Sequence, residues 1–147
     1  MPDEALSRSA GGYGPLTERD VLEAARDLVA AFRATDTAAY FASFSADATF
    51  VFHTEEHRLD SRARYEDLWR GWLAGGWQVT ECVSTNAMVQ LLGGTAVFTH
   101  DVRTTTSTGG TQETTQERET IVFQQTGDGG IMAVHEHLGP VPMSPDE

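Results

Sequence analysis

The stretch that decides the fold spans residues 95–126 and reads TAVFTHDVRTTTST-GG-TQETTQERETIVFQQT. Two long runs, rich in threonine and apolar residues, flank the pair Gly109-Gly110. Threonine and β-branched residues favour strands, and two adjacent glycines favour a tight turn between them. The stretch therefore predicts a long β-hairpin with a two-residue turn.

This turn fixes the pairing of the two strands. It places His100 opposite Glu119 and Phe98 opposite Ile121. Because side chains alternate between the faces of a strand, all four share one face of the hairpin. A bulge of one residue near the turn would exchange the faces and bring 101 and 103 to this side instead.

Two further strands are predicted around the hairpin, over residues 77–92 and 131–138. Gly93-Gly94 separates the first of them from the hairpin, and the glycine-rich residues 127–130 separate the last. Strands joined by short turns in sequence order form antiparallel meanders. The second half of the chain is therefore expected to be a four-stranded antiparallel meander.

The first half of the chain has helical periodicity. One helix is expected to begin at Thr17, with Asp20 completing a capping box, and a second to run from Asp36 to Ser45. A strand over residues 48–53 follows, and then a third helix that begins at Ser61. Helices followed by strands predict an α+β fold, in which three N-terminal helices pack on a curved antiparallel sheet.

The chain has 147 residues, enough for one domain. We expect residues 16–138 to form that domain, because residues 1–15 and 139–147 are rich in glycine or proline and are typical of flexible tails. No stretch resembles a signal peptide or a membrane span, so we expect a cytoplasmic protein that does not bind membranes.

Charge and residue usage exclude several classes of function. The formal net charge is -12, and all 10 basic residues are arginine. A protein without lysine cannot form a lysine Schiff base or use a lysine general base. Its acidity is unfavourable for binding nucleic acids or anionic membranes. The single cysteine, Cys82, fits a reducing compartment and is expected to fill the core.

Three local patterns, at residues 44–49 (FSADAT), 118–123 (RETIVF) and 134–138 (VHEHL), occur in an order that resembles the nuclear transport factor 2-like superfamily, and especially its SnoaL-like branch. The resemblance implies a cone in which helices and the concave sheet face enclose a mostly apolar pocket. It also implies a homodimer formed through the outer sheet face. This fold hosts several activities and non-catalytic proteins, so the resemblance predicts the fold more strongly than a reaction.

Comparison with steroid-isomerase-like members of the superfamily argues against that reaction. The position of their base falls on Phe52, and that of their helix tyrosine falls on Leu28. Both are apolar and cannot transfer protons. The position of their protonated acid falls on Glu119, which retains the residue type.

Glu119 and His100 are the leading candidates for catalysis, because a carboxyl group in an apolar pocket and an imidazole both titrate near neutral pH. The resemblance points Glu136 inward as a second acid. The structural alternatives are an ordinary cross-strand ion pair for Glu119 and His100, and a salt bridge between Glu136 and Arg33. In the latter case, 135 and 137 would line a dimer face.

The expected lining of the pocket is apolar and aromatic, with a histidine at its mouth. It comprises Phe50, Phe52, His53, Tyr65, Trp69, Phe98 and Ile121. Tyr65 and Trp69 belong to a stripe at helical spacing that core packing would explain equally well. The string HTEEH at 53–57 matches an inverted zinc-protease motif, but such a motif requires a helix and a loop is expected here. No metal is therefore expected.

These observations leave three hypotheses for function. The first is a SnoaL-like enzyme that performs acid/base chemistry, such as isomerisation, cyclisation or dehydration, on a hydrophobic small molecule, of which a polyketide-like metabolite is one example. No metal or organic cofactor is expected to take part. The second is a non-catalytic ligand-binding or dimerisation module of the same fold. The third is a carrier that releases its lipophilic ligand unchanged.

Overall fold

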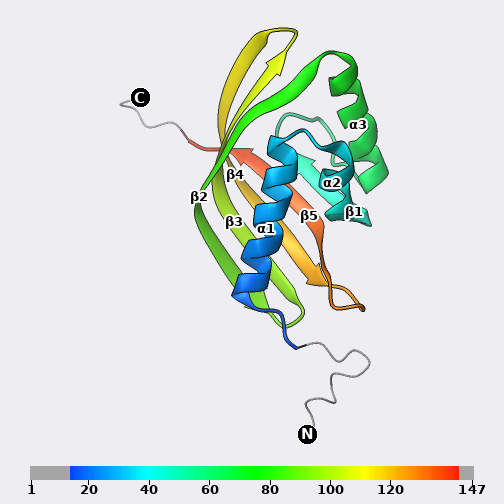
Figure 1. Ribbon diagram of the computed structural model, residues 1–147, viewed down its shortest axis with the longest axis vertical. Coiled ribbons are helices and arrows are strands. Elements are labelled where there is room, and N and C mark those ends of the chain that lie inside the picture. Colours follow the sequence, from blue (N-terminus) through cyan, green and yellow to red (C-terminus); the bar gives the residue numbers. More distant parts are fainter. Residues whose placement is uncertain (1–13, 143–147) are drawn as a thin grey trace, which may run out of the picture.

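A computed structural model describes residues 14–142 (Figure 1). The elements in chain order are α1 (Glu18–Arg33), α2 (Thr37–Ala42), β1 (Phe44–Phe52), α3 (Arg62–Ala74), β2 (Trp77–Leu92), β3 (Thr95–Thr108), β4 (Thr111–Gln125) and β5 (Ile131–Pro140). The three predicted helices and the four-stranded meander are all present. Among the described residues, no helix is long and apolar enough to span a membrane.

Each helix begins at the capping residue that the sequence indicates. The Thr17 hydroxyl accepts a hydrogen bond from the backbone N–H of Asp20, and the Thr17 N–H donates to the Asp20 carboxylate. Asp36 and Ser61 cap α2 and α3 in the same way through their side-chain oxygens. These bonds satisfy N–H groups that have no partner within the helix.

The sheet has the strand order β1-β5-β4-β3-β2. Strands β2 to β5 form the predicted antiparallel meander, and the uninterrupted β3–β4 register pairs His100 with Glu119 and Phe98 with Ile121. The predicted register is thus confirmed. Strand β1 adds to the edge of the sheet by pairing parallel to β5, so one of the four strand pairings is not antiparallel.

The boundary between α2 and β1 differs from the prediction. The helix ends at Ala42 instead of Ser45, and β1 begins at Phe44, four residues before the expected strand. The cause is tertiary, since the Ser43 carbonyl accepts a hydrogen bond from the Ala133 N–H of β5 and Phe44 pairs with Ala133. This pairing with β5 overrides the helical pattern of the local sequence.

The end of β5 also differs from the prediction. Gly139 and Pro140 belong to the strand, where they pair with Arg118 and Glu117. The sequence predicts a flexible C-terminal tail at these two residues, because glycine and proline are typical of such segments. The rest of that predicted tail beyond residue 142 and the first 13 residues of the N-terminal one lie outside the described residues.

The helices pack on one face of the curved sheet, with α1 along the meander and α2 and α3 near β1 (Figure 1). The end of the β3–β4 hairpin, drawn in yellow, projects beyond them. A large part of the core is a group of buried aromatic side chains between the helices and the sheet. They include Tyr40, Phe44, Phe50, Tyr65 and Trp69, and the partly buried Phe32 packs against them.

A register shift in β5 changes which of its residues face the core. The shift lies between the pairs Val122–His135 and Phe123–Ala133, so Val134 is an extra residue. Ala133 and Glu136 are both buried as a result, whereas strict alternation along a strand places residues three apart on opposite faces. Glu136 points inward as the family resemblance implies.

Candidate functional site

A cavity of about 300 Å³ lies between the helices and the concave face of the sheet. Its walls are mostly apolar and aromatic, and include Phe32, Phe52, Trp72 and Trp77. Glu55, which is half-buried, and Glu113, which is exposed, also line the cavity. Its volume is at the lower end of the range typical of small-molecule sites, which is about 300–1,000 Å³.

Two buried carboxyl groups, Glu119 on β4 and Glu136 on β5, form part of the cavity wall. Their strands are adjacent, and Glu136 pairs with Ile121, two residues along β4 from Glu119. Burial raises the pKa of both carboxyl groups. The pKa of Glu136 rises well above its usual value, because the nearby charge of Glu119 adds to the effect of burial.

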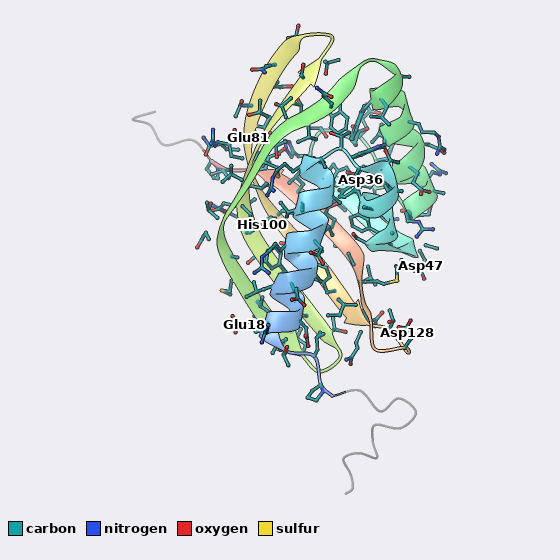
Figure 2. All side chains as sticks on the ribbon, in the orientation of Figure 1. Glu18, Asp36, Asp47, Glu81, His100 and Asp128 are labelled. Atoms are coloured by element: carbon teal, nitrogen blue, oxygen red, sulfur yellow. The ribbon has the colours of Figure 1, made fainter. Side chains whose placement is uncertain are left out.

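His100, labelled in Figure 2, is a buried residue of β3 that does not itself line the cavity. Its Nε2 atom is 2.7 Å from Glu119 Oε1, and its Nδ1 atom is 2.5 Å from the Ser84 hydroxyl oxygen. Burial lowers the pKa of His100 and so favours the neutral ring. In that form Nε2–H donates to Glu119 and the Ser84 hydroxyl donates to Nδ1.

Sequence reasoning did not single out Glu117, although it is buried and lines the cavity. Its Oε2 atom is 2.7 Å from His53 Nε2, and its Oε1 atom accepts a hydrogen bond from the Thr115 hydroxyl at 3.1 Å. The sequence did contain a signal for Glu117, because it lies two residues from Glu119 on the same strand and therefore shares its face. His53 reaches the cavity only through Glu117, because it does not itself line the wall.

Two tyrosine hydroxyls meet at the buried wall of the cavity. The oxygen atoms of Tyr40 on α2 and Tyr65 on α3 are 2.9 Å apart. Burial, with the charge of Glu136 as a second cause, raises the pKa of both well above the usual value. The pair therefore stays neutral and supplies O–H donors close to the two carboxyl groups. Tyr40 carried no functional signal in the sequence, because its place in α2 is typical of a core residue.

The other predicted pocket residues are divided between the wall and the core. Phe52 and Tyr65 line the cavity, whereas Phe50, Trp69 and Ile121 are fully buried and do not. Phe50 and Trp69 pack edge-on against other rings, and the Trp69 N–H donates to the Thr37 hydroxyl. Phe98 lines a second hollow, between α1 and β2. Phe50, Trp69 and Ile121 thus belong to the core, and Phe98 belongs to the second hollow.

The alternative salt bridge between Glu136 and Arg33 does not form. The Arg33 guanidinium donates instead to the Cys82 carbonyl of β2 at 3.2 Å. The HTEEH segment is not helical, His53 binds Glu117, and the His57 side chain is 90% exposed beside Glu56. Across residues 14–142, no group of three or more potential ligands could hold a metal ion.

Solved structures with a similar fold cover most of the chain. An NTF2-like protein of unknown function in nutrient uptake from Rhodospirillum rubrum is 22% identical, with a TM-score of 0.73 over 84% of this chain and 99% of that one. A nuclear transport factor 2 (NTF2-like) superfamily protein from Salmonella enterica is 17% identical, with a TM-score of 0.73 over 88% and 94%. A ketosteroid isomerase-like protein from Erwinia carotovora is 12% identical, with a TM-score of 0.72 over 87% and 100%.

At these identities the solved structures establish the fold and not the activity. No significant match was found among curated proteins. The sequence model of the SnoaL-like domain matches residues 21–144, which is most of the chain. The cone-like arrangement of helices on a curved sheet agrees with that match, and the chain therefore belongs to the SnoaL-like domain family.

Proposed function

We propose that this protein is a SnoaL-like enzyme that performs acid/base chemistry on a hydrophobic small molecule without a cofactor. The observation that carries the proposal is the Glu119–Glu136 carboxyl pair, buried in the wall of a cavity that is otherwise mostly apolar. Two carboxyl groups close together in such a site favour sharing a single proton. One of them is then a base and the other an acid at the same pH.

The surroundings favour one division of the two roles. The Nε2–H group of the neutral His100 ring donates to Glu119 and favours its ionised form, so Glu136, whose pKa burial raises well above its usual value, holds the proton. Glu119 then removes a proton from a carbon atom next to a carbonyl group, and the C–H electron pair moves to form an enolate. Glu136 donates its proton to the enolate oxygen, and the Tyr40–Tyr65 hydroxyl pair stabilises the charge that develops there.

His100 is a positioning residue in this scheme. It does not line the cavity, but its hydrogen bond to Glu119 and its contact with Ser84 hold the carboxylate in one orientation. A neutral imidazole donor stabilises the ionised form of Glu119 without adding a charge to the site. Loss of this hydrogen bond should change the pKa of Glu119 more than it changes the affinity of the cavity for a ligand.

The test uses 5-nitrobenzisoxazole, a small aromatic probe whose ring opens when a base removes its C–H proton. The product is a coloured phenolate, so no natural substrate is needed. We expect Glu119→Gln to lower the rate at which the protein opens the ring of the probe by about 100-fold or more, which is the usual contribution of a general base. Glu113→Gln is the matched control, because Glu113 lines the same cavity from an exposed position.

A rate that is the same in the wild type, the Glu119→Gln variant and free carboxylate solution would contradict the proposed function. The second candidate, a non-catalytic binding module, would then be favoured. It has one observation in its support, since Phe52 lines the cavity at the position where related isomerases carry their base. A module would bind lipophilic compounds and release them unchanged.

A further inference from the structure

The cavity wall has an unusual charge. Five carboxyl side chains line it, and no arginine or histidine is among its described lining residues. They are Glu55, Glu113, Glu117, Glu119 and Glu136. Even when one proton is shared by the Glu119–Glu136 pair, the acidic side chains of the described lining are not balanced by basic ones, which keeps the cavity negative.

The walls between these carboxyl groups are aromatic. Trp72 and Trp77 line the cavity with their ring centres 5.1 Å apart, and Phe32, Phe52 and Tyr65 complete this part of the wall. The faces of aromatic rings carry partial negative charge and attract cations, most strongly when water is excluded. The aromatic and acidic parts of the wall therefore favour the same sign of charge in a ligand.

A second observation points to where that charge belongs. Glu136 is 98% buried, and its Oε1 atom has no hydrogen-bond partner among the described residues. Buried polar atoms are almost always paired, so an unpaired carboxyl oxygen in a cavity wall indicates a missing donor. Its protein neighbours include a second carboxyl group, which cannot donate when ionised.

From these observations we infer that the cavity takes a lipophilic ammonium ion, with the N–H group on Glu136 Oε1 and the apolar body between Trp72 and Phe52. This inference rests on the proposed function only in placing the substrate in this cavity. It narrows the substrate from a hydrophobic molecule to one that carries a protonated amine. A neutral molecule of the same shape lacks the positive charge that the aromatic rings and the ionised Glu119 favour, and an anionic one is repelled by them.

The experiment compares three probes that differ in charge and share a phenyl ring: 2-phenylethylamine, 2-phenylethanol and 3-phenylpropanoate. Binding is followed by tryptophan fluorescence, because Trp72 and Trp77 line the cavity, and by calorimetry. We expect the amine to bind at least about tenfold more tightly than the alcohol, a ratio typical of desolvated cation–aromatic contacts with a nearby carboxylate. The anionic probe should bind most weakly.

Variants show whether the selectivity comes from the buried pair. Glu136→Gln and Glu119→Gln should each reduce the ratio of amine to alcohol affinity towards one. Glu113→Gln should keep most of the ratio, because Glu113 is exposed and its charge is screened by water. Circular dichroism of each variant checks that it is folded.

The two proposals fail separately. Equal affinity for the amine and the alcohol, stronger binding of the anion, or no binding of the amine at millimolar concentration would overturn the ammonium inference. None of these results affects the Glu119-dependent rate with 5-nitrobenzisoxazole. Conversely, charge-selective binding without that rate would overturn the enzymatic proposal and leave the ligand class in place.

Discussion

Replacement of Glu136 by glutamine should make the protein more stable, and increasingly so as the pH rises. The pKa of Glu136 is raised in the folded state, first by burial and then by the charge of Glu119. In the unfolded chain a glutamate has a pKa of about 4.3. Between these two pKa values the unfolded state is ionised and the folded state is protonated, so raising the pH favours unfolding.

The size of this effect follows from the proton balance. One proton is released on unfolding for each molecule, so the free energy of unfolding falls by about 1.4 kcal/mol for each pH unit in this window. Glutamine does not titrate, and therefore this contribution disappears in the variant. At about 4 °C of melting temperature for each kcal/mol in a domain of this size, the two curves should separate by roughly 5 °C per pH unit.

The assay is chemical and thermal denaturation of the wild type and Glu136→Gln at half-unit steps of pH, from about one unit below the unfolded pKa to neutral. Below the unfolded pKa the two proteins should have similar stability, because Glu136 is protonated in both states of the wild type. Glu113→Gln should follow the wild type throughout, since Glu113 is exposed. Parallel pH profiles for the wild type and Glu136→Gln would refute the assignment of the proton to Glu136.

Three further perturbations test the core, the positioning residue and the oligomeric state. Phe50→Ala removes a fully buried ring and should cost about 3–5 kcal/mol in urea denaturation; a smaller loss would show that the aromatic core collapses into the space. Ser84→Ala should shift the NMR titration of His100 without altering amine affinity, and an unchanged titration would contradict the hydrogen bond to Nδ1. Met88, 57% exposed, pairs with Thr99 of β3. If the outer sheet face forms the homodimer expected from the sequence, Met88→Arg should lower the sedimentation coefficient to that of a monomer, and a wild type that already sediments as a monomer would exclude that dimer.

The hairpin shows what local sequence can predict. The turn at Gly109-Gly110 leaves only one register without a bulge, and the alternation of side chains then places His100 and Glu119 together. Their contact, at 2.7 Å, depends only on this turn and on the strand period. The same alternation places Glu117 on the face of Glu119, so its position in the cavity wall was also predictable from the sequence.

The parts of the site that come from separate elements had no such local signal. The hydroxyl groups of Tyr40 and Tyr65 are in contact only because α2 and α3 lie side by side. His53, which follows β1, contacts Glu117 of β4 only because β1 pairs with β5, the neighbour of β4. The inward turn of Glu136 beside Glu119 depends on the extra residue at Val134. A bulge is a property of strand pairing, so the alternation of side chains within one strand does not reveal it.

By itself, the sequence determined the α+β class, the order of the elements, the register of the central hairpin and the acidity of the chain, because periodicity, turn residues and composition act locally or over the whole chain. The tertiary structure decided the parallel pairing of β1 with β5, which aromatic rings line the cavity and which fill the core, and the approach of Glu119 to Glu136. These features arise from packing between segments far apart in the chain. The chemistry proposed for this protein resides mostly in that second group, since a carboxyl group acquires a raised pKa only from its buried surroundings.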